Sequence, residues 1–241
     1  MINFNGKFNS KAPNIGFFVS NDLKFKASKS VSESTASKIN SFLKKVSKNN
    51  KKEILFFDIS ENQRCFLIII KKNLETYEIN NLGAVLKANL KLDKNIKNIC
   101  ILADNISEEI IAEFSYGLEL KSYSFDKYKS KKDGIIQNIE LTVKNLKSFK
   151  TKYKNLSSVR EGVFLARDLV SEPPNVLNPK KYTEEIKKLK KLGLKVEILN
   201  EKQLKKLGMH SLLGVGQGSE NETFLVIVKW NGVKANFGKP L

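Results

Sequence analysis

The stretch Ala166–Pro179, ARDLVSEPPNVLNP, decides how the second part of this chain folds. Before it, residues 157–170 place apolar side chains at helical spacing and predict a helix. The pair Pro173-Pro174 ends that helix, because proline has no amide proton to donate and restricts the residue before it. Asn178 is a favourable N-cap, and Pro179 suits the first position of a new helix. The sequence therefore predicts two helices joined by a fixed bend.

Beyond the bend, the pattern alternates helix and strand. The new helix is expected to bury Tyr182, Ile186 and Leu189 and to end at Gly193. We then expect a strand over 194–199, a short helix over 201–207, a tight glycine turn over 214–219 and a central-type strand over 223–230. This βαβ-like order predicts a parallel or mixed sheet flanked by helices.

The first part of the chain is also of α/β type. Strands are expected over 14–19, 53–59, 64–71, 98–102 and 135–143. Helices are expected from Ser32 onward, with Ser32 or Ser34 as N-cap, over 75–92 with an interruption at Gly83, and over 107–120 with Ser107 as N-cap. Residues 123–134 read as an exposed loop, and the lysine-rich residues 145–154 as a domain boundary. We thus predict a small amino-terminal α/β domain at 1–153, a linker helix with the proline bend at 154–178, and the start of a carboxy-terminal domain at 179–241.

The net charge of +18 suggests nucleic acid as a partner, yet only three of the 43 basic residues are arginine. Arginine is the residue favoured for reading phosphates and base edges, and the lysines are spread along the whole chain. A lysine bias from a genome rich in A and T explains the charge better than a nucleic-acid surface. No apolar run of membrane length and no secretory signal is readable, so we expect a soluble cytoplasmic protein without a membrane partner.

No catalytic or metal-binding cluster can be read from these residues. His210 is the only histidine and is expected to be structural or superficial, while Cys65 and Cys100 lie in apolar runs typical of buried free thiols. The acidic pair Glu108-Glu109 suits the start of a helix. The glycines of 214–219 match neither a phosphate loop nor a nucleophile elbow. We therefore assign no catalytic and no metal-ligating residue, and the substrate-binding residues stay unknown.

Three blocks of sequence together resemble the leucyl aminopeptidase family of dinuclear metallopeptidases. They are Gly117–Leu120 with Tyr123, Phe125-Asp126 and Tyr128-Lys129; then Ala166–Asn175 with Leu177 and Pro179; then Leu207–Met209, Leu213–Val215, Gln217–Ser219 and the strand 224–230. The resemblance implies that 179–241 begins a peptidase domain. It also implies a cytoplasmic homohexamer that removes amino-terminal residues from peptides, using two divalent ions, zinc or manganese, to activate water and polarise the scissile carbonyl.

In that family the metal ligands and catalytic residues follow the position that matches Leu241, and Lys239 is not one of them. The resemblance therefore implies an enzyme fragment that is inactive as it stands, with two metal ions in the full-length protein and none bound specifically by this span. The alternatives are a non-enzymatic basic module that binds nucleic acid or nucleotide, and a chain that acts only in oligomer assembly.

Overall fold

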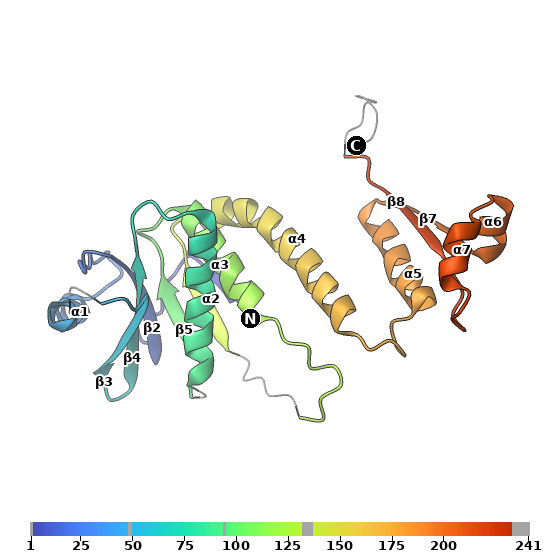
Figure 1. The fold of residues 1–241 in the computed structure, drawn as a ribbon. Coiled ribbons are helices and arrows are strands. Elements are labelled where there is room, and N and C mark those ends of the chain that lie inside the picture. Colours follow the sequence, from blue (N-terminus) through green and yellow to red (C-terminus); the bar gives the residue numbers. More distant parts are fainter. Residues whose placement is uncertain (1, 48–49, 94, 132–136, 233–241) are drawn as a thin grey trace. The chain divides into compact units, whose positions relative to one another are not determined.

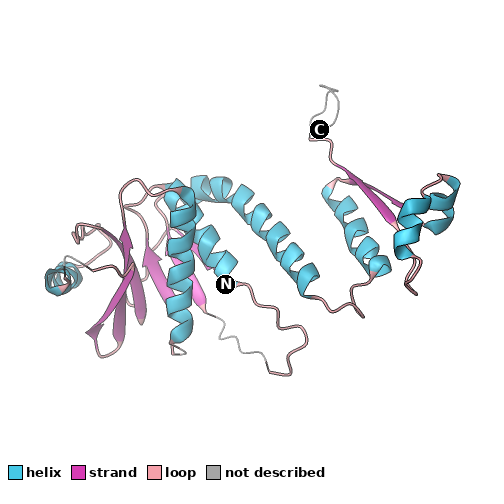
Figure 2. Cartoon of the chain, viewed as in Figure 1, coloured by secondary structure: helices cyan, strands magenta, loops and turns pink. Residues whose placement is uncertain are grey.

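The computed structural model describes residues 2–47, 50–93, 95–131 and 137–232, and its cartoon shows helices and strands mixed throughout (Figure 2). By internal contacts the chain divides into residues 1–166 and 167–241, and each unit is described by itself. Among the described residues, no helix is both long and apolar enough to cross a membrane.

A six-stranded sheet forms the centre of the first unit (Figure 1). Its strands are β1 (Ile2–Asn5), β2 (Asn14–Ser20), β3 (Ile54–Ser60), β4 (Gln63–Ile70), β5 (Asn98–Leu102) and β6 (Asn138–Thr142). They lie in the order β1-β6-β5-β2-β4-β3, and all neighbours are parallel except the hairpin of β3 and β4. The amino-terminal strand β1, which we did not predict, pairs with β6 and becomes one edge of the sheet. The α/β class expected from the sequence is confirmed.

Helices cover both faces of this sheet, as Figure 1 shows. They are α1 (Glu33–Lys45), α2 (Thr76–Leu92), α3 (Glu108–Ser122) and α4 (Leu146–Ser171). One face and α1 form a core that includes Phe17, Leu67 and Ile39. The opposite face packs against α2, α3 and the first turns of α4. The predicted caps are confirmed at two of these helices, since the Ser32 and Ser107 side chains accept hydrogen bonds from amides of the first turn.

Two glycines set the distance between α2 and α3. A β-carbon on Gly83 would lie 2.0 Å from the carbonyl oxygen of Phe114, and one on Gly117 would lie 1.8 Å from that of Asn80. The expectation that Gly83 interrupts the helix was wrong, because α2 continues through it. The residue is glycine because the neighbouring backbone leaves no space for a side chain.

Helix α4 begins at Leu146, eleven residues before the predicted start at Ser157. Its early turns are anchored by apolar burial: Phe149 and Tyr153 are buried, and both rings contact Phe4. Further along, Arg160 forms an ion pair of 2.6 Å with Glu119 of α3, and the Tyr153 hydroxyl donates to the same carboxylate. The polar residues 145–154 therefore belong to a helix that packs on the first unit, although their composition suggested a boundary.

The second unit carries α5 (Pro179–Lys188), a 3-10 turn η1 (Leu189–Leu192), β7 (Lys195–Leu199), α6 (Glu201–Lys206), α7 (His210–Gly216) and β8 (Leu225–Lys229). Gly193 ends the α5–η1 segment with a φ of 89°, as expected of a helix-terminating glycine. Among the described residues β8 pairs with β7 alone and runs antiparallel to it. The two strands are therefore not a parallel βαβ unit, because two short helices return the chain in the opposite direction; an antiparallel pair of this kind belongs to the mixed sheet that was the other prediction.

Two further expectations for the second unit fail, one about which side chains of α5 are buried and one about the backbone of the glycine-rich residues 214–219. Tyr182 is 45% exposed, whereas Thr183 is buried, so the inner face of α5 is rotated by about one position from the predicted one. Gly214 and Gly216 lie inside α7. Of the described glycines, only Gly193 and Gly208 have positive φ. The expected tight turn was based on positive φ at the glycines of 214–219, and those that the structure describes do not adopt it.

Candidate functional site

The proline bend between α4 and α5 is built as predicted. Helix α4 ends at Ser171, and the amides of Val176 and Leu177 both donate to the carbonyl of Pro173 at 2.9 Å, which closes a turn. The Asn178 side chain then accepts from the amide of Lys181 at 3.0 Å and caps α5, with Pro179 in its first turn. The bend is followed by the elements of the second unit, two of which, α6 and α7, surround a cavity.

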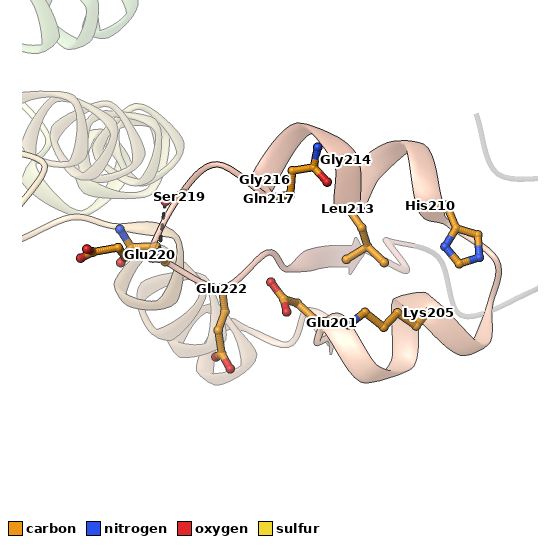
Figure 3. Close-up of a pocket in the computed structure, with 11 residues that line it drawn as sticks. Glu201, Lys205, His210, Leu213, Gly214, Gly216, Gln217, Ser219, Glu220 and Glu222 are labelled. Atoms are coloured by element: carbon orange, nitrogen blue, oxygen red, sulfur yellow. Dashed lines mark hydrogen bonds between the residues drawn. The ribbon is translucent and has the colours of Figure 1, made fainter.

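That cavity lies among α6, α7 and the loop 217–222, and its volume is about 570 Å³ (Figure 3). Its walls are mainly polar, in contrast to the apolar lining typical of small-molecule sites. They are formed by Glu201, Lys205, His210, Leu213, Gly214, Gly216, Gln217, Ser219, Glu220, Asn221 and Glu222. The third sequence block of the aminopeptidase resemblance, residues 207–219, supplies much of this wall. The sequence did not identify the cavity as such.

Glu201 and Gly216, which line the cavity, both lie against Thr223. The Glu201 carboxylate accepts a hydrogen bond of 2.9 Å from the amide of Thr223, at the approach to β8. A β-carbon on Gly216 would meet the Thr223 hydroxyl at 1.9 Å, so the end of α7 is pressed against the same residue. Helix α6 itself starts with a capping box in which Asn200 and Gln203 exchange side-chain and backbone hydrogen bonds. The Glu201 carboxylate thus has a structural role that is visible in its contacts.

His210 is exposed at the start of α7, and within the described part of the chain its imidazole makes no hydrogen bond or ion pair. Figure 3 shows the ring at the end of the cavity near Lys205, while Glu220 and Glu222 point away from the Glu201 carboxylate. No carboxylate therefore orients the imidazole as a general base would require. The expected assignment as a surface histidine agrees with this exposure.

Across residues 2–47, 50–93, 95–131 and 137–232, no three His, Cys, Asp or Glu side chains come together in a way that could hold a metal ion. Three or more such ligands are what a catalytic zinc site needs, and manganese sites are likewise built from several carboxylates. The residues that the structure describes therefore do not fit a dinuclear metal centre. Lys239 lies outside the described residues.

The candidates in the first unit have structural explanations. Glu108 accepts a hydrogen bond of 2.7 Å from the Ser148 hydroxyl, and Lys152 forms ion pairs with Glu108 and Glu109. The hydrogen bond from Ser148 lowers the pKa of Glu108, and that from Lys152 lowers the pKa of Glu109. The acidic pair therefore joins the start of α3 to α4, beyond the predicted role of helix start.

Both cysteines are free and buried, as predicted. Burial raises the pKa of the Cys65 thiol, and burial next to Glu140 raises that of Cys100 to about 11. Thiols held protonated in this way are poor nucleophiles. Neither cysteine is a candidate catalytic group.

The aromatic and basic residues that follow α3 make contacts within the first unit. The Tyr123 ring lies 5.3 Å from that of Phe164 on α4, and Lys129 pairs with Asp126 at 3.0 Å. Tyr128 is 54% exposed, but its ring packs 5.8 Å from Phe125. The part of this segment up to residue 131 is therefore a folded loop, as predicted, while residues 132–134 lie outside the described part.

Comparison with known proteins agrees with the three blocks. Residues 164–240 match a sequence model described as the cytosol aminopeptidase family, catalytic domain. A probable cytosol aminopeptidase of Wolbachia pipientis is 41% identical over 158 residues, which cover 63% of this chain and 31% of that protein. Those of Sinorhizobium fredii and Agrobacterium fabrum are 42% and 43% identical and match 57% and 59% of this chain. The chain spans about a third of the length of the curated relatives it matches.

Solved structures share the fold. A tomato leucine aminopeptidase mutant is similar with a TM-score of 0.73 and 20% identity, covering 94% of this chain and 50% of that one. The bottromycin maturation enzyme BotP, in complex with Mn, gives a TM-score of 0.65 at 17% identity, covering 91% of this chain and 45% of that one. The bend, the order of elements and these matches agree. Over the residues that the matches cover, the chain is similar to the cytosol aminopeptidase family.

Proposed function

We propose that residues 1–241 are the front part of a leucyl-type metallo-aminopeptidase, a hydrolase that removes amino-terminal residues from peptides. The observation that carries this proposal is the match of residues 164–240 to the family's catalytic domain, in a chain spanning about a third of its curated relatives. We further propose that the metal centre of this enzyme is built from protein outside the described residues. On this account the present span is inactive alone.

The described part of the second unit then serves as the start of the peptidase domain. Its β7–β8 pair offers a strand edge on which further strands can form. The division into an amino-terminal domain at 1–153, a linker at 154–178 and a peptidase domain from 179 belongs to the same proposal.

Cofactor, partners and location follow from the family in the same way. We infer two divalent ions, manganese or zinc, in the full-length enzyme, peptide substrates, a homohexamer and a cytoplasmic location. Support comes from the names of the relatives, which are cytosol aminopeptidases, and from the Mn complex of the structural neighbour BotP. A nucleic-acid module is not favoured, because the matches are to peptidases.

The test is a chimera. Residues 1–232 are joined to the part of the Wolbachia pipientis relative that follows the matching position, and leucine release from leucine p-nitroanilide is followed with and without Mn²⁺. We expect the chimera to hydrolyse the substrate in a Mn²⁺-dependent manner, and residues 1–241 alone to give the uncatalysed rate. The downstream part of the relative, expressed by itself, is the matched control and is expected to be inactive without the β7–β8 pair.

Mn²⁺-dependent hydrolysis by residues 1–241 alone would show that the metal site lies within this span, and the proposal would fail. A folded chimera that binds Mn²⁺ but does not cleave the substrate would also contradict it.

A further inference from the structure

We propose that a cavity at the carboxyl ends of β2 and β4 binds a small phosphate-bearing anion of the polyphosphate class. The cavity has a volume of about 430 Å³ and lies wholly in the first unit. The residues that carry the argument are Asn21 and Leu23 after β2, Lys71 after β4, and Lys51, Lys52 and Glu53 before β3. Nothing in the aminopeptidase proposal requires this site.

The topology of the sheet opens a crevice at this place. Strands β2 and β4 are parallel neighbours in register from Asn14 with Arg64 to Ser20 with Ile70. After β2 the chain turns to α1 on one face of the sheet, and after β4 it turns to α2 on the other. In open α/β sheets, ligands bind outside the carboxyl ends of strands where adjacent connections diverge in this way.

A second crevice of the same kind lies between β2 and β5, because β5 leads to α3 on the face opposite α1. That crevice is filled. Phe25 is 8% exposed, its ring lies 5.3 Å from that of Phe17, and the remaining cavity has a volume of only about 10 Å³. A space of that size holds at most one water molecule. Of these two crevices, as far as the described residues form them, the one between β2 and β4 has room for a ligand.

The charge of the open crevice favours an anion. Lys51, Lys52 and Lys71 line it against one carboxylate, that of Glu53. Within the described ranges none of the three ammonium groups has a carboxylate within 4.0 Å. Residues 48 and 49, which lie outside the described part, are lysine and asparagine and so add no negative charge. Unpaired lysines that converge on one cavity bind phosphate as point charges.

The size and lining of the cavity identify a small molecule as the ligand. A volume of about 430 Å³ falls in the usual range for small-molecule sites. No aromatic side chain lines the cavity, so it lacks the stacking platform that single-stranded nucleic acids use. The loop that presents two of the lysines is braced, since the Asn50 amide donates to the Lys52 carbonyl at 3.0 Å. The backbone from which the Lys51 and Lys52 side chains extend is thereby fixed beside the cavity.

The experiment is a titration of the full chain with sodium tripolyphosphate, followed by calorimetry and by amide chemical shifts in an NMR spectrum. The test variant combines Lys51→Gln, Lys52→Gln and Lys71→Gln. The matched control combines Lys7→Gln, Lys11→Gln and Lys97→Gln, three exposed lysines in loops that precede β2 and β5. Both variants lower the formal charge by three, and thermal unfolding confirms that both are folded.

We expect the test variant to bind tripolyphosphate about eightfold more weakly, since each of the three exposed ammonium–phosphate pairs contributes a factor of about two. The control variant should change by less than about twofold, and the shifted amides of the wild-type chain should include Asn21, Leu23 and Lys71. The proposal is overturned if the wild-type chain does not bind tripolyphosphate, or if both variants weaken binding equally. Binding of single-stranded DNA without binding of tripolyphosphate would likewise overturn it.

Discussion

The close contact between α2 and α3 makes Gly117 the most informative position for a stability test. In the substitution Gly117→Ala, the new methyl group would be placed 1.8 Å from the carbonyl oxygen of Asn80. An ordinary carbon–oxygen contact is about 3.3 Å or longer, so the two helices must move apart by more than one ångström. The contact is backbone, which no rotamer change can relieve.

The expected loss in free energy of unfolding is about 2 kcal/mol. Overpacking of a well-packed core costs about 1–3 kcal/mol and sometimes more, and here the displaced atoms belong to a whole helix. Alanine is a better helix former than glycine by about 1 kcal/mol, which offsets part of that cost. For a unit of this size, 2 kcal/mol corresponds to a fall in Tm of about 4–8 °C.

Gly162 provides the control, because it lies in the middle of α4 and a β-carbon there would meet no atom within 4 Å. Gly162→Ala should therefore raise the free energy of unfolding by about 0.5–1 kcal/mol through helix propensity alone. Urea denaturation monitored by far-UV circular dichroism measures both variants. If Gly117→Ala is neutral or stabilising, as Gly162→Ala is, the inferred α2–α3 contact is wrong.

Three further predictions concern buried polar groups. Glu119→Gln should lower the free energy of unfolding, measured by urea denaturation, by about 1–3 kcal/mol, because it leaves Arg160 and the buried Tyr153 hydroxyl without their shared carboxylate. An unchanged midpoint of urea denaturation would contradict that network. Cys100, whose pKa is raised to about 11, should react with a thiol reagent at pH 8 far more slowly in the native chain than in denaturant, and equal rates would refute its burial. Burial lowers the pKa of Lys87, so the unfolded chain keeps the ammonium proton to a higher pH than the folded chain does. The free energy of unfolding should therefore rise as the pH increases toward 10.5, and Lys87→Met should make this rise less steep. If the free energy of unfolding depends on pH in the same way in the wild type and the variant, the effect is excluded.

Local signals in the sequence predicted the start of three helices and the end of one, although not the start of α4. Ser107 and Asn178 were predicted as caps because a short polar side chain precedes an amphipathic run, and Ser32 was one of two candidates for its helix, beside Ser34. The side chains of Ser32, Ser107 and Asn178 all accept the expected hydrogen bond. Gly193 was identified as a helix end because glycine adopts positive φ at low cost. Helix caps and helix-ending glycines depend on residues a few positions apart, so a single sequence is enough to predict them.

Features that depend on distant parts of the chain were missed. Strand β1 is four residues long and is stabilised by pairing with β6, more than 130 residues away. A pattern in neighbouring residues cannot predict such a pairing. Gly83 looked like a break because its requirement comes from Phe114 on another helix. The cavity between α6 and α7 was missed for the same reason, since the Glu201–Thr223 hydrogen bond connects two separate elements.

The central claim, that this span belongs to a metallo-aminopeptidase but does not carry its metal centre, is tested most directly by equilibrium dialysis of residues 1–241 against Mn²⁺. The account predicts no stoichiometric binding by this chain and Mn²⁺ binding by the chimera with the downstream part of the Wolbachia pipientis relative. Stoichiometric binding of Mn²⁺ by residues 1–241 alone would contradict it.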